Sequence, residues 1–328
     1  GYSSAMHYFD QAGRRQTHWD EAQGMKDLER AVEFASAWDG KYEGRVRAIL
    51  VPWEVHLSSA ELLQKTKSAA RELGVGITLH VAESMLEFQD IVRGTGRTPV
   101  GWLADLGILG PEVILGHCLY LGGHSQTAYP FAGDLDAIAG SGASVAHCPL
   151  VFGRRGVTLE SFQRYLDHGV NMSTGTDSYP QDLLGELKFV SVLSKVADRS
   201  FESANARDVF NAATLGGAKA LRRPDLGRLA PGAKADIVIV DFERPRIGPF
   251  LDPIKALIHC ADGDAIERVI VAGKTLVEGG RLIVWDEREL LESVRRSTAR
   301  AWGRFPEYYA LNQPIDEAFP PAFKRWTG

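Results

Sequence analysis

ITLHVAES (residues 77–84) is the first of four similar stretches in this 328-residue chain, and VILGHCLY (113–120), ASVAHCP (143–149) and NMSTGTDS (171–178) follow it. Each stretch is an apolar run that leads to a polar side chain, in turn His80, His117, His147 and Asp177. Successive polar residues are 37, 30 and 30 positions apart. A (β/α)8 barrel of ~250 residues uses about 31 residues for each strand–helix unit, and its active site lies at the carboxyl ends of the strands. The spacing therefore predicts one catalytic face built from successive strands.

Five βα units can be counted in the chain, with strands near Ile49, Leu79, Leu115, Val145 and Ser173. A closed barrel of this type needs eight. We therefore predict an α/β fold that holds about five units of a TIM-type barrel and is incomplete at its amino-terminal side. About 90 or more further residues are expected before Gly1 in the natural protein. The 328 residues alone are expected to aggregate or to be inactive, because open strand edges would be exposed.

Helix signals separate these strands. The first helix is expected over about 19–38, and residues before it give no clear element. The sequence Ser58-Ser59-Ala60-Glu61 is a capping-box arrangement that opens a helix to about Leu73, which Gly74 ends. Further helices are expected over 134–139, 159–168, 183–196 and 207–221.

The pattern changes after residue 222. Strands at 236–241 and 267–272 are separated by a Pro-rich stretch without a crossover helix, and 274–277 continues the second strand into a hairpin. We expect three parts, namely a barrel portion (1–222), a small β-sandwich module (223–285), and a helix with an aromatic and proline arm (286–328). That arm is expected to pack on the body or on a partner subunit, and it carries Phe305, Tyr308, Tyr309, Phe319, Phe323 and Trp326.

The composition is that of a globular protein, with 45% hydrophobic and 24% charged residues. A net charge of -5 gives no reason to expect nucleic acid or an acidic membrane as a partner. No apolar stretch reaches the ~18–20 residues that span a bilayer. The cysteines number three, and Cys118 and Cys148 lie in strands expected to be buried. We therefore expect no disulfide framework and a cytoplasmic location.

His80 and Glu83 form an H-x-x-E pair at a strand end, and Asp177 ends the last strand of the series. Imidazole and carboxylate groups that converge from different strands are suitable ligands for a divalent metal with an open coordination position. Such a metal makes water nucleophilic at neutral pH, and a nearby carboxylate that does not bind the metal can transfer the proton. Glu83 is placed for that transfer. Zinc is the first choice of metal, and iron or manganese would suit the same ligands.

Taken together, His80-Val-Ala-Glu83, Gly116-His117, His147-Cys-Pro149 and Gly175-Thr-Asp177-Ser178 resemble the amidohydrolase superfamily. Within it, the chain is similar to the branch of cytosine, guanine and S-adenosylhomocysteine deaminases and triazine hydrolases. Two later stretches resemble that superfamily's return to a β-sandwich and its closing hairpin, and they are LGRLAPGAKADIV (226–238) and IVAGKTLV (270–277).

The resemblance implies a role for each matching residue. His80 would be a metal ligand, and Asp177 a ligand that also takes a proton from the attacking water. Glu83 would be the proton shuttle, and His117 would polarise the substrate or orient the water. The superfamily's first-strand His-x-His, which supplies two more ligands, is absent from this chain and is expected in the preceding residues. His7 and His18 are not promoted to that role, because neither is paired or on an expected strand.

Other residues near strand ends are candidates for substrate contact. His147 is as suited to contacting substrate as to a structural hydrogen bond, and Trp53 and Phe152 are placed to stack on a flat ring. His56 fits a hydrated loop better than a pocket. The Arg154–Arg155 pair between Gly153 and Gly156 fits either an anionic substrate group or a solvated loop. Leu150-Val-Phe152 replaces a Ser-Asn found in many of the deaminases, which weakens a purine-type specificity.

The favoured function is a metal-dependent aminohydrolase that acts on a small nitrogen heterocycle, and a homodimer is expected. A triazine-type chlorohydrolase or N-dealkylating hydrolase would use the same machinery with another leaving group. An amide hydrolase is the next alternative. A non-catalytic binding protein is the fourth, because two expected metal ligands are missing from the chain.

Overall fold

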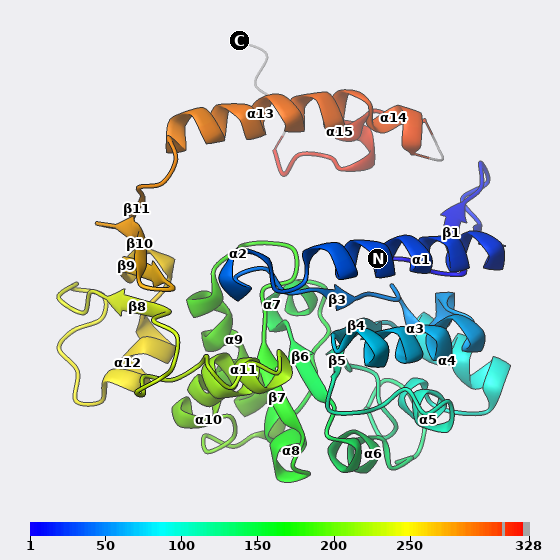
Figure 1. The fold of residues 1–328 in the computed structure, drawn as a ribbon, viewed down its shortest axis with the longest axis horizontal. Helices are drawn as coiled ribbons and strands as arrows, with labels where there is room; N and C mark the ends of the chain where they lie inside the picture. The colour runs from blue at the N-terminus through cyan, green and yellow to red at the C-terminus, as the bar shows by residue number, and fades with distance from the viewer. Residues whose placement is uncertain (310–311, 324–328) are drawn as a thin grey trace.

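A computed structural model describes residues 1–309 and 312–323 of the protein (Figure 1). Its centre is a five-stranded sheet in the order β3-β4-β5-β6-β7, in which all neighbouring strands are parallel. The strands are β3 (Ile49–Leu50), β4 (Gly76–Val81), β5 (Val113–His117), β6 (Ser144–His147) and β7 (Asn171–Thr174). Strand order follows chain order, as consecutive βα units require. The five strands predicted from the sequence are therefore confirmed.

Helices connect consecutive strands of this sheet. Ahead of β4 the chain forms α1 (Glu21–Trp38), α2 (Lys41–Gly44), the 3₁₀ turn η1 (Val55–Leu57) and α3 (Ala60–Leu73). Between β4 and β7 lie α4 (Met85–Thr95), α5 (Pro99–Asp105), α6 (Asp134–Ser141), α7 (Pro149–Gly153) and α8 (Phe162–Asp167). After β7 come α9 (Leu183–Asp198), α10 (Ala206–Asn211), the π-helical segment η2 (Ala212–Gly216) and α11 (Gly217–Ala220).

Helix α3 shows how local sequence sets these boundaries. The Ser59 hydroxyl accepts a hydrogen bond from the Leu62 backbone N–H at 3.0 Å and caps the first turn. Gly74 ends the helix with φ of 70°, a left-handed conformation that glycine adopts without steric cost. Both ends agree with the capping signals in the sequence.

The hydrophobic core lies along the central strands. Leu79, Leu115 and Val145 are adjacent across β4, β5 and β6, and each is at most 2% exposed. Strands that are apolar on both faces are typical of a parallel sheet covered by helices. This core fixes the carboxyl ends of the strands relative to one another.

The first residues form a β-hairpin, so the expectation of no clear element there was wrong. Strand β1 (Ala5–Phe9) pairs antiparallel with β2 (Arg15–Trp19). Neither strand has the apolar alternation by which a half-buried strand is recognised. The preceding Tyr2 is 4% exposed, forms a bridge to Pro52 and bonds Thr66 Oγ1 through its hydroxyl at 2.9 Å. Non-local contacts therefore fix the position of the segment before the hairpin.

The later strands form a separate antiparallel sheet in the order β11-β10-β9-β8. They are β8 (Ile237–Val240), β9 (Ile266–Val271), β10 (Lys274–Glu278) and β11 (Arg281–Leu282). The expectation that no helix separates β8 from β9 was wrong, because α12 (Pro253–Cys260) and the 3₁₀ turn η3 (Gly263–Ala265) lie between them. Asp252 caps α12 by accepting from two backbone N–H groups, and proline is well suited to the first helical position. The prolines that suggested a loop include one that starts a helix.

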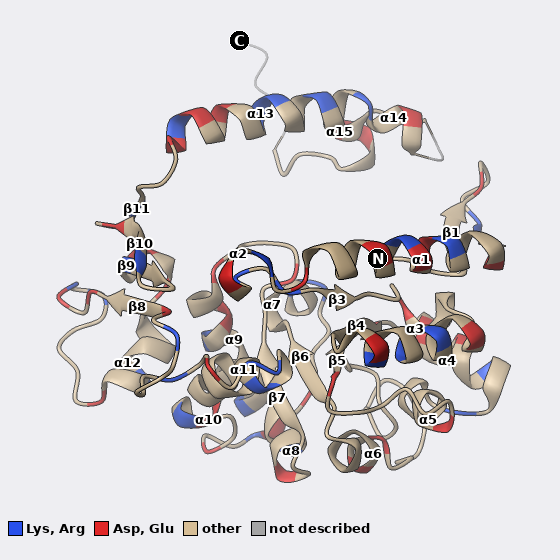
Figure 2. Cartoon of the chain, viewed as in Figure 1, with Lys and Arg blue, Asp and Glu red and all other residues tan. Residues whose placement is uncertain are grey.

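The carboxyl-terminal arm is formed by α13 (Glu287–Gly303), α14 (Phe305–Tyr308) and α15 (Ile315–Ala318). No residue of α13 is buried, and its acidic side chains lie toward its start while its basic side chains lie mostly toward its end (Figure 2). The arm's aromatic residues pack on one another, since Phe305 stacks on Tyr309 and meets Phe319 edge-on. Trp326 lies outside the described residues. No helix of the described chain is long and apolar enough to cross a membrane.

Gly216 in η2 is a position where an added methyl group has no room. A Cβ there would overlap the carbonyl oxygen of Met172 in β7. We expect Gly216→Ala to lower the free energy of unfolding by about 1–3 kcal/mol, as overpacking does. Gly140 in α6 is the matched control, because a Cβ there meets nothing within 4 Å and alanine favours a helix. Chemical denaturation of both variants checks this, and equal stability would show that η2 moves freely away from β7.

Candidate metal-binding and catalytic site

The polar residues singled out from the sequence lie at one edge of the central sheet. His80 lies in the last part of β4, His117 and His147 end β5 and β6, and Asp177 follows β7. Val81 pairs with His117, and His147 pairs with Thr174. Because the strands are parallel, their carboxyl ends face the same way. The register therefore brings the polar residues to a common edge.

His80, Glu83, His117 and Asp177 form a cluster at this edge. Potential ligand atoms of His80, Glu83 and His117 all lie within 4.8 Å of one another. The His80 and His117 rings are stacked, with centroids 5.3 Å apart and planes 8° apart. Asp177 Oδ2 lies 4.0 Å from His117 Nε2. This mixture of imidazole nitrogen and carboxylate oxygen is a donor set that zinc accepts.

His80 is oriented by the backbone of the neighbouring strand end. Its Nδ1 is hydrogen-bonded to the Trp53 carbonyl oxygen at 2.7 Å. Because a carbonyl only accepts, Nδ1 is the donor in this bond. This leaves Nε2 as the ring nitrogen that can face a metal, which is how metal-binding histidines are usually held. The Trp53 ring centroid is 6.1 Å from that of His80, and its indole N–H donates to Glu54 Oε1. Trp53 is therefore part of the rim of this cluster.

His117 is held in the neutral form. Burial lowers its pKa to about 3, and the nearby His80 and His147 contribute to the same effect. Its Nδ1 is buried and has no hydrogen-bond partner among the described residues. A neutral, partly unpaired imidazole retains a lone pair for a metal, a water molecule or a substrate atom. The chemistry of the cluster therefore depends on an uncharged His117.

Residues with positive backbone φ angles lie at the same strand ends. Ala82, His117 and Asp177 have φ values of 53°, 73° and 55°. Positive φ is uncommon for residues other than glycine, and such strain often occurs at functional sites where the surrounding structure holds it. Ala82 directly precedes Glu83, and His117 and Asp177 are themselves members of the cluster.

Glu83 has an environment suited to proton transfer. Burial raises its pKa, the neighbouring His80 opposes the rise, and Glu54 and Asp177 reinforce it. A carboxyl group with a raised pKa exchanges protons more readily near neutral pH. The electrostatic surroundings of Glu83 therefore resemble those of a general acid–base group.

Glu87 holds Glu83 in place, and sequence reasoning missed it. The Glu87 side chain is buried, and its two oxygens accept from the Ala82 and Glu83 backbone N–H groups at 2.6 and 2.7 Å. Burial raises the pKa of Glu87, and these two donors oppose the rise. Ser84 caps α4 by accepting from the Glu87 N–H, so Ser84-x-x-Glu87 is a capping-box sequence that could have drawn attention to it. Unlike a usual capping box, the carboxylate reaches past the cap to the turn that bears Glu83.

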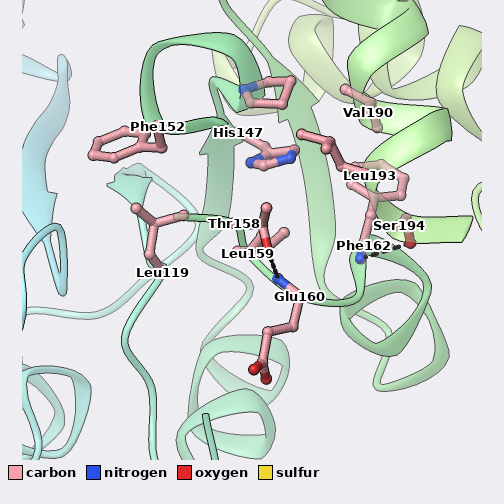
Figure 3. Close-up of a pocket in the computed structure, with 11 residues that line it drawn as sticks. Leu119, His147, Phe152, Thr158, Leu159, Glu160, Phe162, Val190, Leu193 and Ser194 are labelled. Carbon is pink, nitrogen blue, oxygen red and sulfur yellow. Dashed lines mark hydrogen bonds between the residues drawn. The ribbon is translucent and has the colours of Figure 1, made fainter. Parts of the chain in front are cut away.

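His147 is not one of the clustered residues and lines a small cavity of about 10 Å³ (Figure 3). That volume is close to the space needed for one water molecule. Burial lowers the pKa of His147 to about 3, and its Nδ1 has no partner within the described part of the chain. Phe152 lines the same cavity and also packs edge-on against the His117 ring, with centroids 4.7 Å apart. Phe152 thus borders both the cavity lined by His147 and the His117 ring of the cluster.

A second histidine pair joins the amino-terminal hairpin to η1. His7 Nε2 is 3.0 Å from His56 Nε2. The His56 side chain is only 6% exposed, so its expected place in a hydrated loop was wrong. His7 and His18 were expected to lie outside any strand, and this was also wrong, because they belong to β1 and β2. The hairpin brings His7 to His56 through a contact that the sequence alone does not reveal.

Curated proteins similar to this chain are named as deaminases. The 5'-deoxyadenosine deaminase of Methanosarcina mazei is 32% identical over 283 residues, which are 85% of this chain and 63% of that protein. The 5-methylthioadenosine/S-adenosylhomocysteine deaminase of Pelotomaculum thermopropionicum is 30% identical over the same shares. The chain thus spans about 63% of the length of these relatives.

Solved structures share the fold. An adenosine deaminase from Xanthomonas campestris with bound zinc has a TM-score of 0.76 at 24% identity, over 87% of this chain and 63% of that one. The atrazine chlorohydrolase of Arthrobacter aurescens complexed with zinc has a TM-score of 0.71 at 26% identity, over 82% and 60%. Both proteins were solved with zinc.

The sequence profile of the amidohydrolase family matches residues 9–276, which include the whole parallel sheet and the clustered residues. The match covers more than half of the chain. The strand-end motifs and the likeness to solved zinc-bound structures agree with it. The chain therefore belongs to the amidohydrolase family.

Proposed function

We propose that this protein is a metal-dependent aminohydrolase that removes an amino group from an adenine nucleoside of the 5'-deoxyadenosine type. The observation that carries the proposal is the cluster of His80, Glu83, His117 and Asp177 at one edge of the sheet. The deaminases that are about 30% identical over most of this chain support the choice of substrate class. A homodimer and a cytoplasmic location remain predictions.

We further propose that the five parallel strands are five units of a (β/α)8 barrel. Their chain order and the likeness to solved family structures support this. The barrel portion would comprise residues 1–222, the β-sandwich module 223–285, and the helix with its arm 286–328. The antiparallel sheet β8–β11 falls within the second of these parts.

His80 and Asp177 would hold the metal. The Nε2 lone pair left by the bond from His80 Nδ1 to Trp53, and the carboxylate of Asp177 beside His117, fit a zinc ion. Bound zinc would supply the lowered pKa of water that makes it a nucleophile at neutral pH. Iron or manganese is also compatible with these ligands.

The remaining residues would manage protons and position the substrate. Asp177 would accept one proton from the attacking water, and protonated Glu83 would give its proton to a ring nitrogen. Glu83 would then take the remaining proton of the added hydroxyl group and pass it to the amino group, which leaves as ammonia, and the proton held by Asp177 would restore Glu83. Water would thus add at the carbon that bears the amino group, and the carbon–nitrogen bond would break. Neutral His117 would orient the water or polarise the ring, while Trp53, Phe152 and His147 would shape the substrate's surroundings.

Ammonia release from a panel of purine nucleosides, pyrimidines, pterins and triazines tests this function. The complete natural protein loaded with zinc is expected to release ammonia from 5'-deoxyadenosine or a close analogue. Chloride release from a chlorotriazine would support the triazine alternative, which the likeness to atrazine chlorohydrolase favours. Release of neither product, with an amide cleaved instead, would support an amide hydrolase. If the protein releases no product and also holds no metal, a non-catalytic binding protein is supported.

Glu87→Gln tests whether the Glu87 side chain holds the turn that bears Glu83. Glutamine keeps one acceptor oxygen, so one of the buried N–H groups of Ala82 and Glu83 loses its partner. We expect the free energy of unfolding to fall by about 1–3 kcal/mol. Turnover should fall ~10–100-fold, as it does when groups that orient metal-site residues are removed.

Glu61→Gln is the matched control for Glu87→Gln, because Glu61 lies in the first turn of α3 with its side chain 64% exposed. It should leave stability and turnover nearly unchanged. Denaturation and steady-state kinetics of both variants decide the outcome. Unchanged turnover in Glu87→Gln would show that the turn holds Glu83 without this carboxylate.

A further inference from the structure

Two arginines follow α7 in a short turn with a fixed shape. The Arg155 backbone N–H donates to the Phe152 carbonyl oxygen at 2.8 Å, and the Val157 N–H donates to the same oxygen at 3.1 Å. Gly156 has φ of 73°, which closes the turn without strain. Arg154 and Arg155 are therefore presented from a defined backbone.

The turn places Arg155 close to the catalytic cluster. Its guanidinium carbon lies over the Phe152 ring, 5.7 Å from the centroid. The same ring packs edge-on against His117, at a centroid distance of 4.7 Å. Phe152 is 4% exposed, so it is a fixed spacer. The Arg155 cation and His117 therefore lie against the same aromatic ring.

Arg154 borders the same region from the side of β7. Its guanidinium lies over the Tyr179 ring at 4.0 Å, and Tyr179 follows Asp177 by two positions. Both arginines are exposed, and in the described part of the chain neither forms an ion pair with a carboxylate. Two accessible cations without partners thus lie beside the rim of the cluster.

We propose that Arg155, bordered by Arg154, binds an oxyanion carried by the substrate, so that the preferred substrate is an amino-heterocycle with a carboxylate or a phosphate on its substituent. A guanidinium fork matches either group by paired hydrogen bonds. The inference rests on the proposed function, because it assumes that the reacting ring lies at the cluster. It adds a charged group to the substrate class.

Matched substrates test it in the zinc-loaded, complete natural protein. 5'-Deoxyadenosine is the neutral member, and adenosine 5'-carboxylate and adenosine 5'-phosphate are the two anionic members. Arg155→Met is expected to lower kcat/KM for the preferred anionic substrate by ~10–100-fold, the effect of losing hydrogen bonds to a charged group. The neutral substrate should change by less than about threefold. Comparison of the two anionic substrates shows whether carboxylate or phosphate is recognised.

Two further variants separate recognition from a general charge effect. Arg155→Lys keeps the positive charge but cannot donate paired, parallel hydrogen bonds, so it should retain only part of the preference for anionic substrates. Arg207→Met is the matched control, because Arg207 lies on α10 with its side chain 80% exposed. It should leave both kinds of substrate unchanged. Equal losses for neutral and anionic substrates in Arg155→Met would overturn the inference and leave Arg155 as a modifier of the local field.

A binding measurement keeps this result apart from the proposed function. Calorimetry on the Glu83→Gln variant measures the affinity for anionic and neutral amino-heterocycles without turnover, including pyrimidine and triazine carboxylates. Anionic rings should bind more tightly, and the difference should shrink in Arg155→Met and at high salt. If this holds while no compound releases ammonia, the inference stands and the aminohydrolase proposal fails. If a neutral nucleoside is deaminated but no anionic ring binds more tightly, the inference fails alone.

Discussion

Glu83→Gln is expected to lower turnover by about 100-fold or more, the lower end of what general acid–base groups contribute. Glutamine has nearly the same shape as glutamate but can neither accept nor deliver the proton. The backbone N–H bond from Glu83 to Glu87 does not involve the Glu83 side chain, so the turn should keep its shape. Steady-state kinetics on the zinc-loaded protein, with ammonia as the measured product, gives the change.

Metal content of the same variant decides what Glu83 does. His80, Glu83 and His117 lie close enough together for all three to be considered as ligands. If Glu83 is the proton shuttle, Glu83→Gln retains its zinc after dialysis. Loss of zinc together with activity would make Glu83 a ligand. Full activity would leave Glu83 with a structural role only.

His80→Ala is expected to abolish tight metal binding and to remove activity with it. Loss of a residue that hydrogen-bonds to a metal ligand typically lowers metal affinity 10–100-fold. Loss of a direct ligand should therefore lower it by more than ~100-fold. The Trp53 carbonyl oxygen, which now accepts from His80 Nδ1, would face the space that the ring leaves. Zinc titration and elemental analysis of the dialysed protein measure the effect.

His168→Ala is the matched control for His80→Ala. His168 is 40% exposed and pairs with Asp136 at 2.9 Å, outside the cluster. Both variants should unfold cooperatively, which shows that lost metal does not reflect lost structure. Retention of zinc by His80→Ala at the affinity of the unchanged protein would remove His80 from the metal site and with it the present assignment.

Local signals were enough to find the elements that carry the site. Apolar runs placed β4 to β7, and capping residues such as Ser59 and Gly74 placed the limits of α3. These signals act between neighbours in the chain, so a single sequence contains them. The same local reasoning erred at α12, where the Asp252–Pro253 start signal was read as part of a loop. That error was one of interpretation, since the signal was present.

The sequence also determined which residues to consider and where they lie along the strands. Because parallel strands present their carboxyl ends at one edge, the order of His80, His117 and Asp177 was sufficient to predict that they meet. The proximity of His80, Glu83 and His117, and of His117 to Asp177, agrees with that prediction of a common edge. Their separate chemical roles remain predictions.

Only the tertiary structure decided the environments of these groups. Burial keeps His117 neutral and raises the pKa of Glu83, and packing leaves His147 lining a water-sized cavity. Burial depends on segments that are distant in sequence. The contact between His7 and His56 spans 49 positions, and the contact of Phe152 with His117 joins α7 to β5. Spacing along the chain sets which side chains can reach a strand end. The packing of other elements sets their charge, their partners and their access to solvent, because desolvation and electrostatic effects depend on distance in space.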